Sequence, residues 1–101
     1  MHTNEAELFR SYPPPNSSSL YLDIRVVRSS ALLAQALVEG RIVYASGDYG
    51  YVEAWKGRGV KGYFTRFVRF GRAVDSVKER TARQCVGKFR AFHRKAHGDS
   101  R

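Results

Sequence analysis

The sequence predicts one small domain of the α+β class. Its 101 residues are the length of a single ordinary domain. Alternating apolar residues indicate strands, and apolar residues at helical spacing indicate two helices. These elements follow one another as strand, helix, three-stranded antiparallel meander and long C-terminal helix. We expect the domain to occupy residues 20–98, preceded by an appendage with a Pro/Ser-rich linker over 1–19 and followed by a tail over 99–101.

The domain is expected to begin with a strand and a short helix. The segment 20–28, LYLDIRVVR, alternates apolar residues with other types, which predicts a strand with one buried face. The segment 29–40, SSALLAQALVEG, starts with serines that can cap a helix. It ends in Gly40, a residue suited to the left-handed conformation that terminates many helices.

A three-stranded meander is expected next. The strands RIVYAS, 41–46, and YVEAW, 51–55, flank the turn signal GDYG. The segment 62–70, GYFTRFVRF, is dense in β-branched and aromatic residues and predicts the third strand. A small sheet backed by two helices needs large side chains in its core. From this strand we assign three residues to the core: Phe64, Val68 and Phe70.

A long helix over 73–97 completes the predicted fold. Ser76 and Glu79 have capping-box spacing near its start, and Gly98 lies beyond its end. At about 100° per residue, the segment separates an apolar stripe from an arginine stripe about 33 Å long. The apolar stripe consists of Val74, Val77, Thr81, Cys85, Phe89, Phe92 and Ala96. The arginine stripe consists of Arg72, Arg80, Arg83, Arg90 and Arg94, with Gly87 on the same side.

The charge of the chain is strongly asymmetric. The formal net charge is +9. Residues 1–50 carry four Lys and Arg against five Asp and Glu, whereas residues 51–101 carry fourteen against four. The excess positive charge therefore lies in the C-terminal half, which favours a polyanionic partner. The arginine stripe has few glutamates to pair with, and the guanidinium group suits phosphate, so we interpret the stripe as phosphate-binding rather than as an ordinary solvated face.

A glycine-rich loop adds to the basic surface. Gly57, Gly59 and Gly62 spell G-x-G-x-x-G. A dinucleotide fingerprint needs a helix directly after this pattern, and here a strand-like segment follows. We therefore interpret the loop as a basic hairpin connection that can bind a phosphate, or as a flexible loop with solubilising charges. The cations around it are Lys56, Arg58 and Lys61, and Arg66 and Arg69 follow on the third strand.

Aromatic residues are concentrated on the meander. Tyr and Trp tolerate a partly wet surface, and rings beside arginines can stack on unpaired bases or act as interface hot spots. The residues assigned to this role are Tyr49, Tyr51, Trp55 and Tyr63.

Catalysis, metal binding and membrane insertion find little support. The carboxylates are scattered, although Asp23, Asp48 or Glu53 could still be brought together by the fold. His93 and His97 have i, i+4 spacing, but no further Cys joins the lone Cys85 to complete a zinc set. No apolar run approaches the roughly 20 residues of a membrane span. We expect no enzyme activity, no cofactor, no metal and no stable membrane insertion.

These observations together predict a non-enzymatic nucleic-acid-binding protein. The single cysteine fits a reducing compartment, so we expect a cytoplasmic protein. The alternative is a small interaction or inhibitor protein, of the kind made by phages and mobile elements, that caps an acidic or nucleoprotein surface. The sequence leaves open whether the nucleic acid is DNA or RNA. A homodimer formed through Phe89 and Phe92 is also considered.

Overall fold

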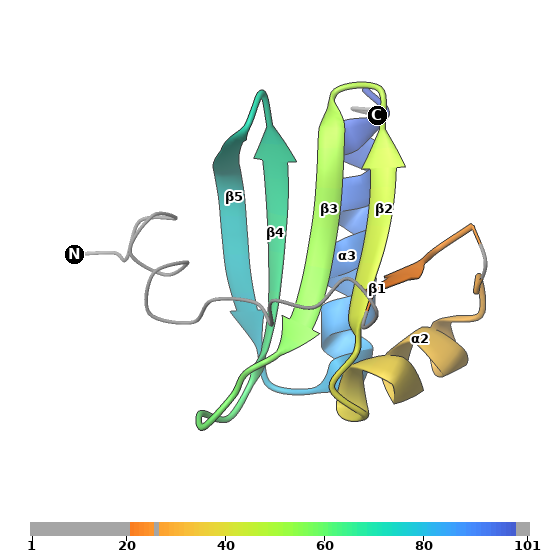
Figure 1. The fold of residues 1–101 in the computed structure, drawn as a ribbon, viewed down its shortest axis with the longest axis vertical. Helices are drawn as coiled ribbons and strands as arrows, with labels where there is room; N and C mark the ends of the chain where they lie inside the picture. Colours follow the sequence, from red (N-terminus) through yellow and green to blue (C-terminus); the bar gives the residue numbers. More distant parts are fainter. Residues whose placement is uncertain (1–20, 26, 99–101) are drawn as a thin grey trace.

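The chain folds into a five-stranded sheet with two helices on one of its faces (Figure 1). This computed structural model describes residues 21–25 and 27–98. The predicted appendage over 1–19 and the tail over 99–101 lie outside the described residues. The elements are β1 (Tyr21–Asp23), α2 (Ser30–Val38), β2 (Ile42–Gly47), β3 (Gly50–Lys56), β4 (Tyr63–Arg69), β5 (Arg72–Glu79) and α3 (Ala82–Ala96).

The strands lie in the sheet in their sequence order, β1-β2-β3-β4-β5. β1 pairs with β2 in parallel, and α2 forms the crossover between them. The other pairs are antiparallel. The predicted α+β class is confirmed, with one more strand in the meander than the sequence indicated.

Local sequence explains the first two elements. The carboxylate of Asp23 accepts a hydrogen bond from the backbone N–H of Arg25 at 2.8 Å, so the chain turns and β1 ends well before the predicted residue 28. The hydroxyl of Ser29 accepts from the N–H of Leu32 and caps α2, as predicted. Gly40 follows α2 with φ +87°, the predicted left-handed position.

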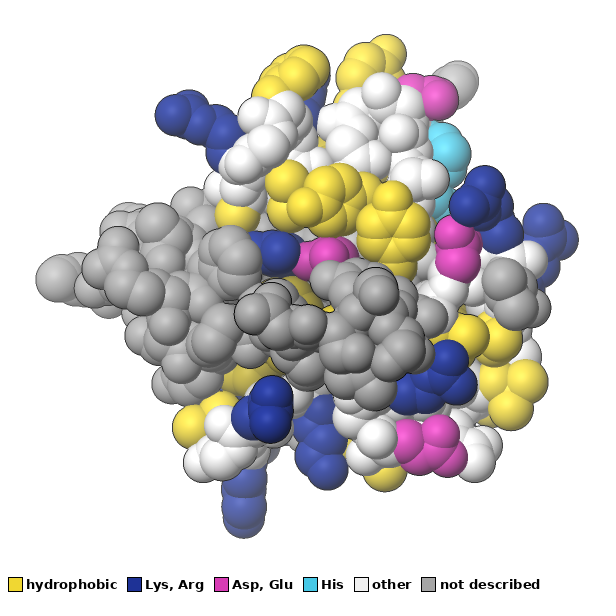
Figure 2. All heavy atoms as spheres, in the orientation of Figure 1, with side chains coloured by type: hydrophobic (Ala, Val, Ile, Leu, Met, Phe, Trp, Pro, Cys, Tyr) yellow, Lys and Arg dark blue, Asp and Glu magenta, His cyan; other side chains and the backbone are white. Residues whose placement is uncertain are grey.

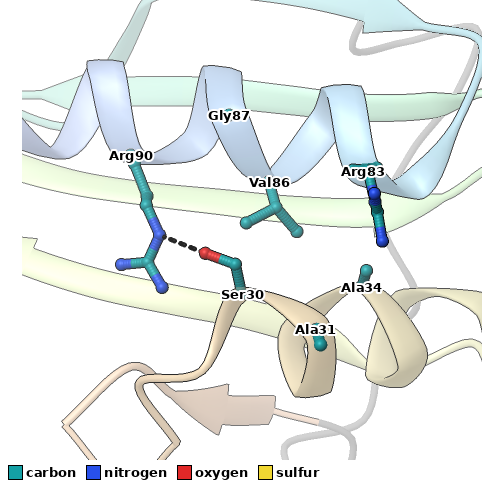
Figure 3. A pocket seen from close by; sticks show the side chains of 7 residues that line it. All are labelled: Ser30, Ala31, Ala34, Arg83, Val86, Gly87 and Arg90. Atoms are coloured by element: carbon teal, nitrogen blue, oxygen red, sulfur yellow. Dashed lines mark hydrogen bonds between the residues drawn. The ribbon is translucent and has the colours of Figure 1, made fainter.

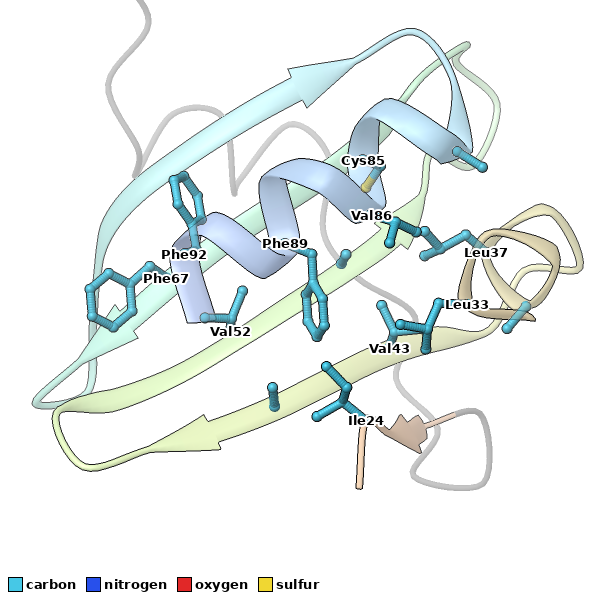
Figure 4. Packing of buried hydrophobic residues seen from close by; sticks show 14 of the residues in the cluster. Ile24, Leu33, Leu37, Val43, Val52, Phe67, Cys85, Val86, Phe89 and Phe92 are labelled. Atoms are coloured by element: carbon cyan, nitrogen blue, oxygen red, sulfur yellow. The ribbon is translucent and has the colours of Figure 1, made fainter. Parts of the chain in front are cut away.

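The main core lies between the sheet and the two helices (Figure 4). β2, β3 and β4 supply alternate residues to it, and α3 supplies its apolar side. Cys85 is buried within this core, as predicted, with Sγ 3.2 Å from Oγ1 of Thr65, and burial raises the pKa of the thiol to about 11. Phe89 and Phe92 are also buried here, so the homodimer contact considered through these rings is wrong.

The predicted helix start is wrong, because residues 72–79 form β5. The segment pairs with β4, with Thr65 opposite Val77 and Arg66 opposite Ser76. α3 begins instead after Thr81, whose hydroxyl accepts from the N–H of Gln84 while the Gln84 side chain accepts from the N–H of Thr81. This is the same capping-box pattern that was assigned to Ser76 and Glu79, displaced by five residues.

Phe70 is not a core residue, contrary to the prediction. β4 ends at Arg69, and Phe70 and Gly71 form a two-residue turn in which both φ angles are positive, +52° and +75°. This turn places Phe70 at the tip of the hairpin, where it is 85% exposed. The ring lies against Arg69, whose guanidinium carbon is 5.2 Å from the ring centroid.

The substitution Phe70→Asn is expected to raise the free energy of unfolding by about 0.5–1 kcal/mol. Asn adopts the left-handed region at lower cost than Phe, and little buried surface is lost. Urea denaturation with an unchanged m-value measures the effect. Gly71→Ala is the control, expected to lower stability by about 1 kcal/mol at its positive φ. A less stable Phe70→Asn protein would contradict this account of the turn.

A second, smaller cluster occupies the sheet face away from the helices. It consists of Ile42, Trp55 and Phe64, and the rings of Trp55 and Phe64 stack with centroids 6.0 Å apart. Trp55 is only 2% exposed, so its assignment to the surface is wrong, whereas the burial predicted for Phe64 is confirmed.

Candidate nucleic-acid interface

The cations assigned to phosphate binding fall into separate regions of the fold. Figure 2 views the molecule in the orientation of Figure 1, and Lys and Arg side chains project at several places around its margin. One group lies on the β3–β4 loop, a second on α3 and a third at the β4–β5 turn. Only some of these groups can act together on one ligand.

The β3–β4 loop is closed at its base and open at its tip. The N–H of Gly57 donates to the carbonyl of Gly62 at 2.9 Å, and the cations at 56, 58 and 61 are exposed. Gly59 and Gly62 have φ of +75° and +125°, conformations that favour glycine. Strands flank the loop on both sides, which agrees with its interpretation as a hairpin connection rather than a dinucleotide fingerprint.

This loop lies near the start of α3. Tyr63 pairs with Glu79, so the β3–β4 loop and the C-terminal end of β5 lie at the same end of the sheet. The Lys78 side chain passes over Gly62, with Cε 2.7 Å from where a Cβ on that glycine would lie. Arg80 follows directly, in the connection to α3. The loop cations and the first arginine of α3 are therefore at the same end of the molecule.

The arginine stripe is shorter than predicted. Arg72 lies on β5 and Arg80 precedes the helix, so neither belongs to it. At about 100° per residue, the remaining arginines share a sector of about 40°, or about 60° with Gly87, and at 1.5 Å per residue they extend over about 16 Å. These members are Arg83, Arg90 and Arg94, with Gly87 between them. We call them the α3 arginine face.

The α3 arginine face borders a groove between α2 and α3 (Figure 3). The groove has a volume of about 460 Å³. Arg83 and Arg90 stand on either side of Val86 along the helix, and small residues of α2 lie opposite them. The lining consists of Ser30, Ala31, Ala34, Arg83, Val86, Gly87 and Arg90 and contains no acidic residue.

Arg90 is fixed in place at one side of this groove. Its Nε donates to the hydroxyl of Ser30 at 3.0 Å, and its Nη2 donates to the carbonyl of Arg28. These bonds tie α3 to the start of α2. Because the guanidinium is held by neutral acceptors, its positive charge is not cancelled by them.

Gly87 keeps the groove open. A Cβ built on it would meet no atom within 4 Å, so the space above this turn of the helix is empty. Glycine in a helix interior costs roughly 0.5–1 kcal/mol relative to alanine. Alanine would fit at this position without a clash, so packing does not require glycine. The glycine leaves the helix surface accessible.

Arg66 is not available to phosphate, contrary to its assignment. Its Nη2 and Nε donate to Oε2 of Glu53 at 2.7 and 2.9 Å, and both side chains are buried. Its guanidinium also lies over the ring of Trp55 at 5.6 Å. Arg69 and Arg72 are exposed, but they flank the β4–β5 turn, across the sheet from the glycine-rich loop.

Of the four aromatic residues assigned to the surface, only Tyr49 is widely exposed, at 48%. Tyr51 is half-buried against Tyr44, with ring centroids 5.6 Å apart. Tyr63 packs partly against the main core. The four residues do not form one platform, and the ring of Phe70, which was predicted to be buried, is more exposed than any of them, at 85%.

The two C-terminal histidines tie α3 to the β2–β3 hairpin. Nε2 of His97 lies 2.9 Å from Nε2 of His93, which lies 3.2 Å from the carbonyl oxygen of Ser46. Burial lowers the pKa of His93. Within residues 21–25 and 27–98, no group of three or more His, Cys, Asp or Glu residues is arranged to hold a metal ion. Neither described helix has the length and apolar character needed to cross a membrane.

Sequence reasoning missed the α2 side of the groove. Ser30, Ala31 and Ala34 have no chemical signal of their own, and only their small size at helical spacing allows α3 to approach. Their role depends on which helix packs beside them. Comparison with known proteins does not add to this picture, because no family model, curated protein or solved structure matches the chain.

Proposed function

We propose that this protein binds nucleic acid without catalysing a reaction on it. The observation that carries the proposal is the α3 arginine face with its open groove, which has no carboxylate in its lining. Among the described residues, the only Lys and Arg side chains within ion-pair distance of a carboxylate are Arg25, Arg66 and Lys95. The other cations keep their charge available for a partner.

The interface is formed by the α3 arginine face and the loop cations near the start of that helix. Duplex DNA carries one negative charge per about 1.7 Å of its axis, so a face about 16 Å long meets several phosphates. The guanidinium groups bind phosphate oxygens through charge-assisted hydrogen bonds. About five phosphates are contacted, from Arg58, Lys61, Arg83, Arg90 and Arg94.

Binding is expected to weaken steeply with salt. With about five phosphates neutralised, the logarithm of affinity should fall against the logarithm of salt with a slope of about −4 to −5 on duplex DNA and about −3.5 on a single strand. Fluorescence anisotropy with labelled oligonucleotides at about 50 to 300 mM salt measures this slope. A flat salt response would contradict the proposal.

A charge-reversal pair tests the location. Arg83→Glu with Arg94→Glu should reduce the salt slope by about 2 and weaken binding at least about tenfold at low salt. Arg69→Glu with Arg72→Glu changes the net charge equally at the β4–β5 turn and serves as the control. Equal losses in both variants would show that net charge alone drives binding. A cellular partner that stays bound after nuclease treatment would instead indicate an acidic protein.

A further inference from the structure

We propose that the groove between α2 and α3 holds one nucleotide of a single-stranded nucleic acid. The base lies on the apolar floor formed by Ala31, Ala34 and Val86, and a phosphate lies at Arg83 and Arg90. This inference rests on the proposed function and specifies its ligand. It assigns a base-contacting site in addition to the phosphate contacts proposed above.

The size and lining of the groove fit such a unit. A volume of about 460 Å³ is within the range of small-ligand sites. The charged residues of the lining, Arg83 and Arg90, both lie on α3, and the rest of the lining is small or apolar apart from Ser30, so the groove suits a ligand that joins a flat ring to an anion. A nucleotide has both parts, whereas an Asp or Glu side chain of a partner protein would leave the apolar floor uncovered.

Arg90 is preorganised for the phosphate. The bonds from its Nε to Ser30 and from its Nη2 to the Arg28 carbonyl fix the plane of the guanidinium. Its Nη1 makes no hydrogen bond to a described residue and can donate to a phosphate oxygen. Little side-chain entropy is lost on binding, because the side chain is already ordered.

Arg83 completes the site from about two turns earlier on α3 than Arg90. It has no carboxylate partner among the described residues, and its side chain extends beside Ala34 (Figure 3). A guanidinium plane in this position can stack on a base or bind the adjacent phosphate.

Gly87 gives the ligand access to the helix backbone. Because a Cβ here would point into empty space, a methyl group would occupy part of the groove without disturbing the fold. A base that is paired in a duplex cannot enter a hollow between two helices, so the site selects single strands, in which bases are free to turn outward.

The test compares a ten-nucleotide single strand with an abasic strand of the same length and charge. The wild-type protein should bind the strand with bases about tenfold more tightly, because only bases bury surface on the groove floor. Gly87→Ala should remove this preference, keep the salt slope and raise the Tm. Arg94→Ala, which lies outside the groove, should weaken binding to both strands equally and keep the preference.

Three other results of this binding experiment would each contradict a specific part of the proposal. Equal binding of both strands by the wild type would overturn the nucleotide site and leave polyanion binding standing. A preference unchanged in Gly87→Ala would place base recognition elsewhere and overturn the site as well. No binding of either strand would overturn both this inference and the proposed function.

Discussion

Replacing Phe89 by alanine is expected to lower the free energy of unfolding by about 3–5 kcal/mol. Phe89 is 0% exposed and lies between α3 and the sheet, near Val43 and Val52 (Figure 4). Removing the ring loses its transfer free energy and leaves a cavity that rigid strands on one side cannot close. Since a domain of this size is stable by only about 5–15 kcal/mol, this loss removes a large fraction of the total stability.

Chemical denaturation followed by far-UV circular dichroism measures this loss. Phe70→Ala is the matched control, since it deletes the same ring from a position that is 85% exposed, and its stability should change by less than about 0.5 kcal/mol. Similar losses in the two variants would contradict the packing of α3 on the sheet. The pair therefore tests directly which aromatic residues belong to the core.

Residue alternation predicted the faces of β4 but not where the strand ends. Phe64 and Val68 are buried as expected, and Arg66 lies on the same side of the strand. Phe70 continues this alternation in the sequence, but the chain has already entered the turn. A Phe-Gly pair lacks the Asn or Asp that usually indicates this type of turn, so no local signal placed the strand end before Phe70.

The start of α3 could not be chosen from the sequence because two capping boxes compete. Ser76 with Glu79 and Thr81 with Gln84 both fit the pattern. The second pair caps the helix because residues 72–79 gain ladder hydrogen bonds to β4, a long-range interaction. Because α3 therefore begins after Thr81, Arg72 and Arg80 do not belong to the arginine stripe.

The candidate site was predicted in part. Helical spacing correctly put Arg83, Gly87 and Arg90 on one side of α3. Spacing could not show that α2 packs beside this side and turns an exposed face into a groove. Nor could spacing distinguish Arg66, which forms an ion pair with the buried Glu53, from the arginines that can bind a partner.

Breaking the ion pair between Arg66 and Glu53 is expected to destabilise the fold by about 3 kcal/mol or more. Arg66→Met removes the cation and leaves the Glu53 carboxylate buried without the two hydrogen bonds it accepts from this guanidinium. Water cannot replace them at a buried site without opening the structure. Arg25→Met is the control: its bond to Asp23 is formed by a guanidinium that is 79% exposed, so the loss of stability should be far smaller than that of Arg66→Met.

The same two variants separate a structural arginine from a binding one. If Arg66 serves the fold alone, Arg66→Met should lower stability while the folded protein keeps its affinity and salt slope for an oligonucleotide. The double substitution Glu53→Leu with Arg66→Met should recover much of the lost stability, because both buried charges are then removed together. Equal destabilisation by Arg66→Met and Arg25→Met would show that Arg66 is solvated. A reduced salt slope in Arg66→Met would show that Arg66 binds phosphate after all, since only a cation in contact with phosphate contributes to that slope.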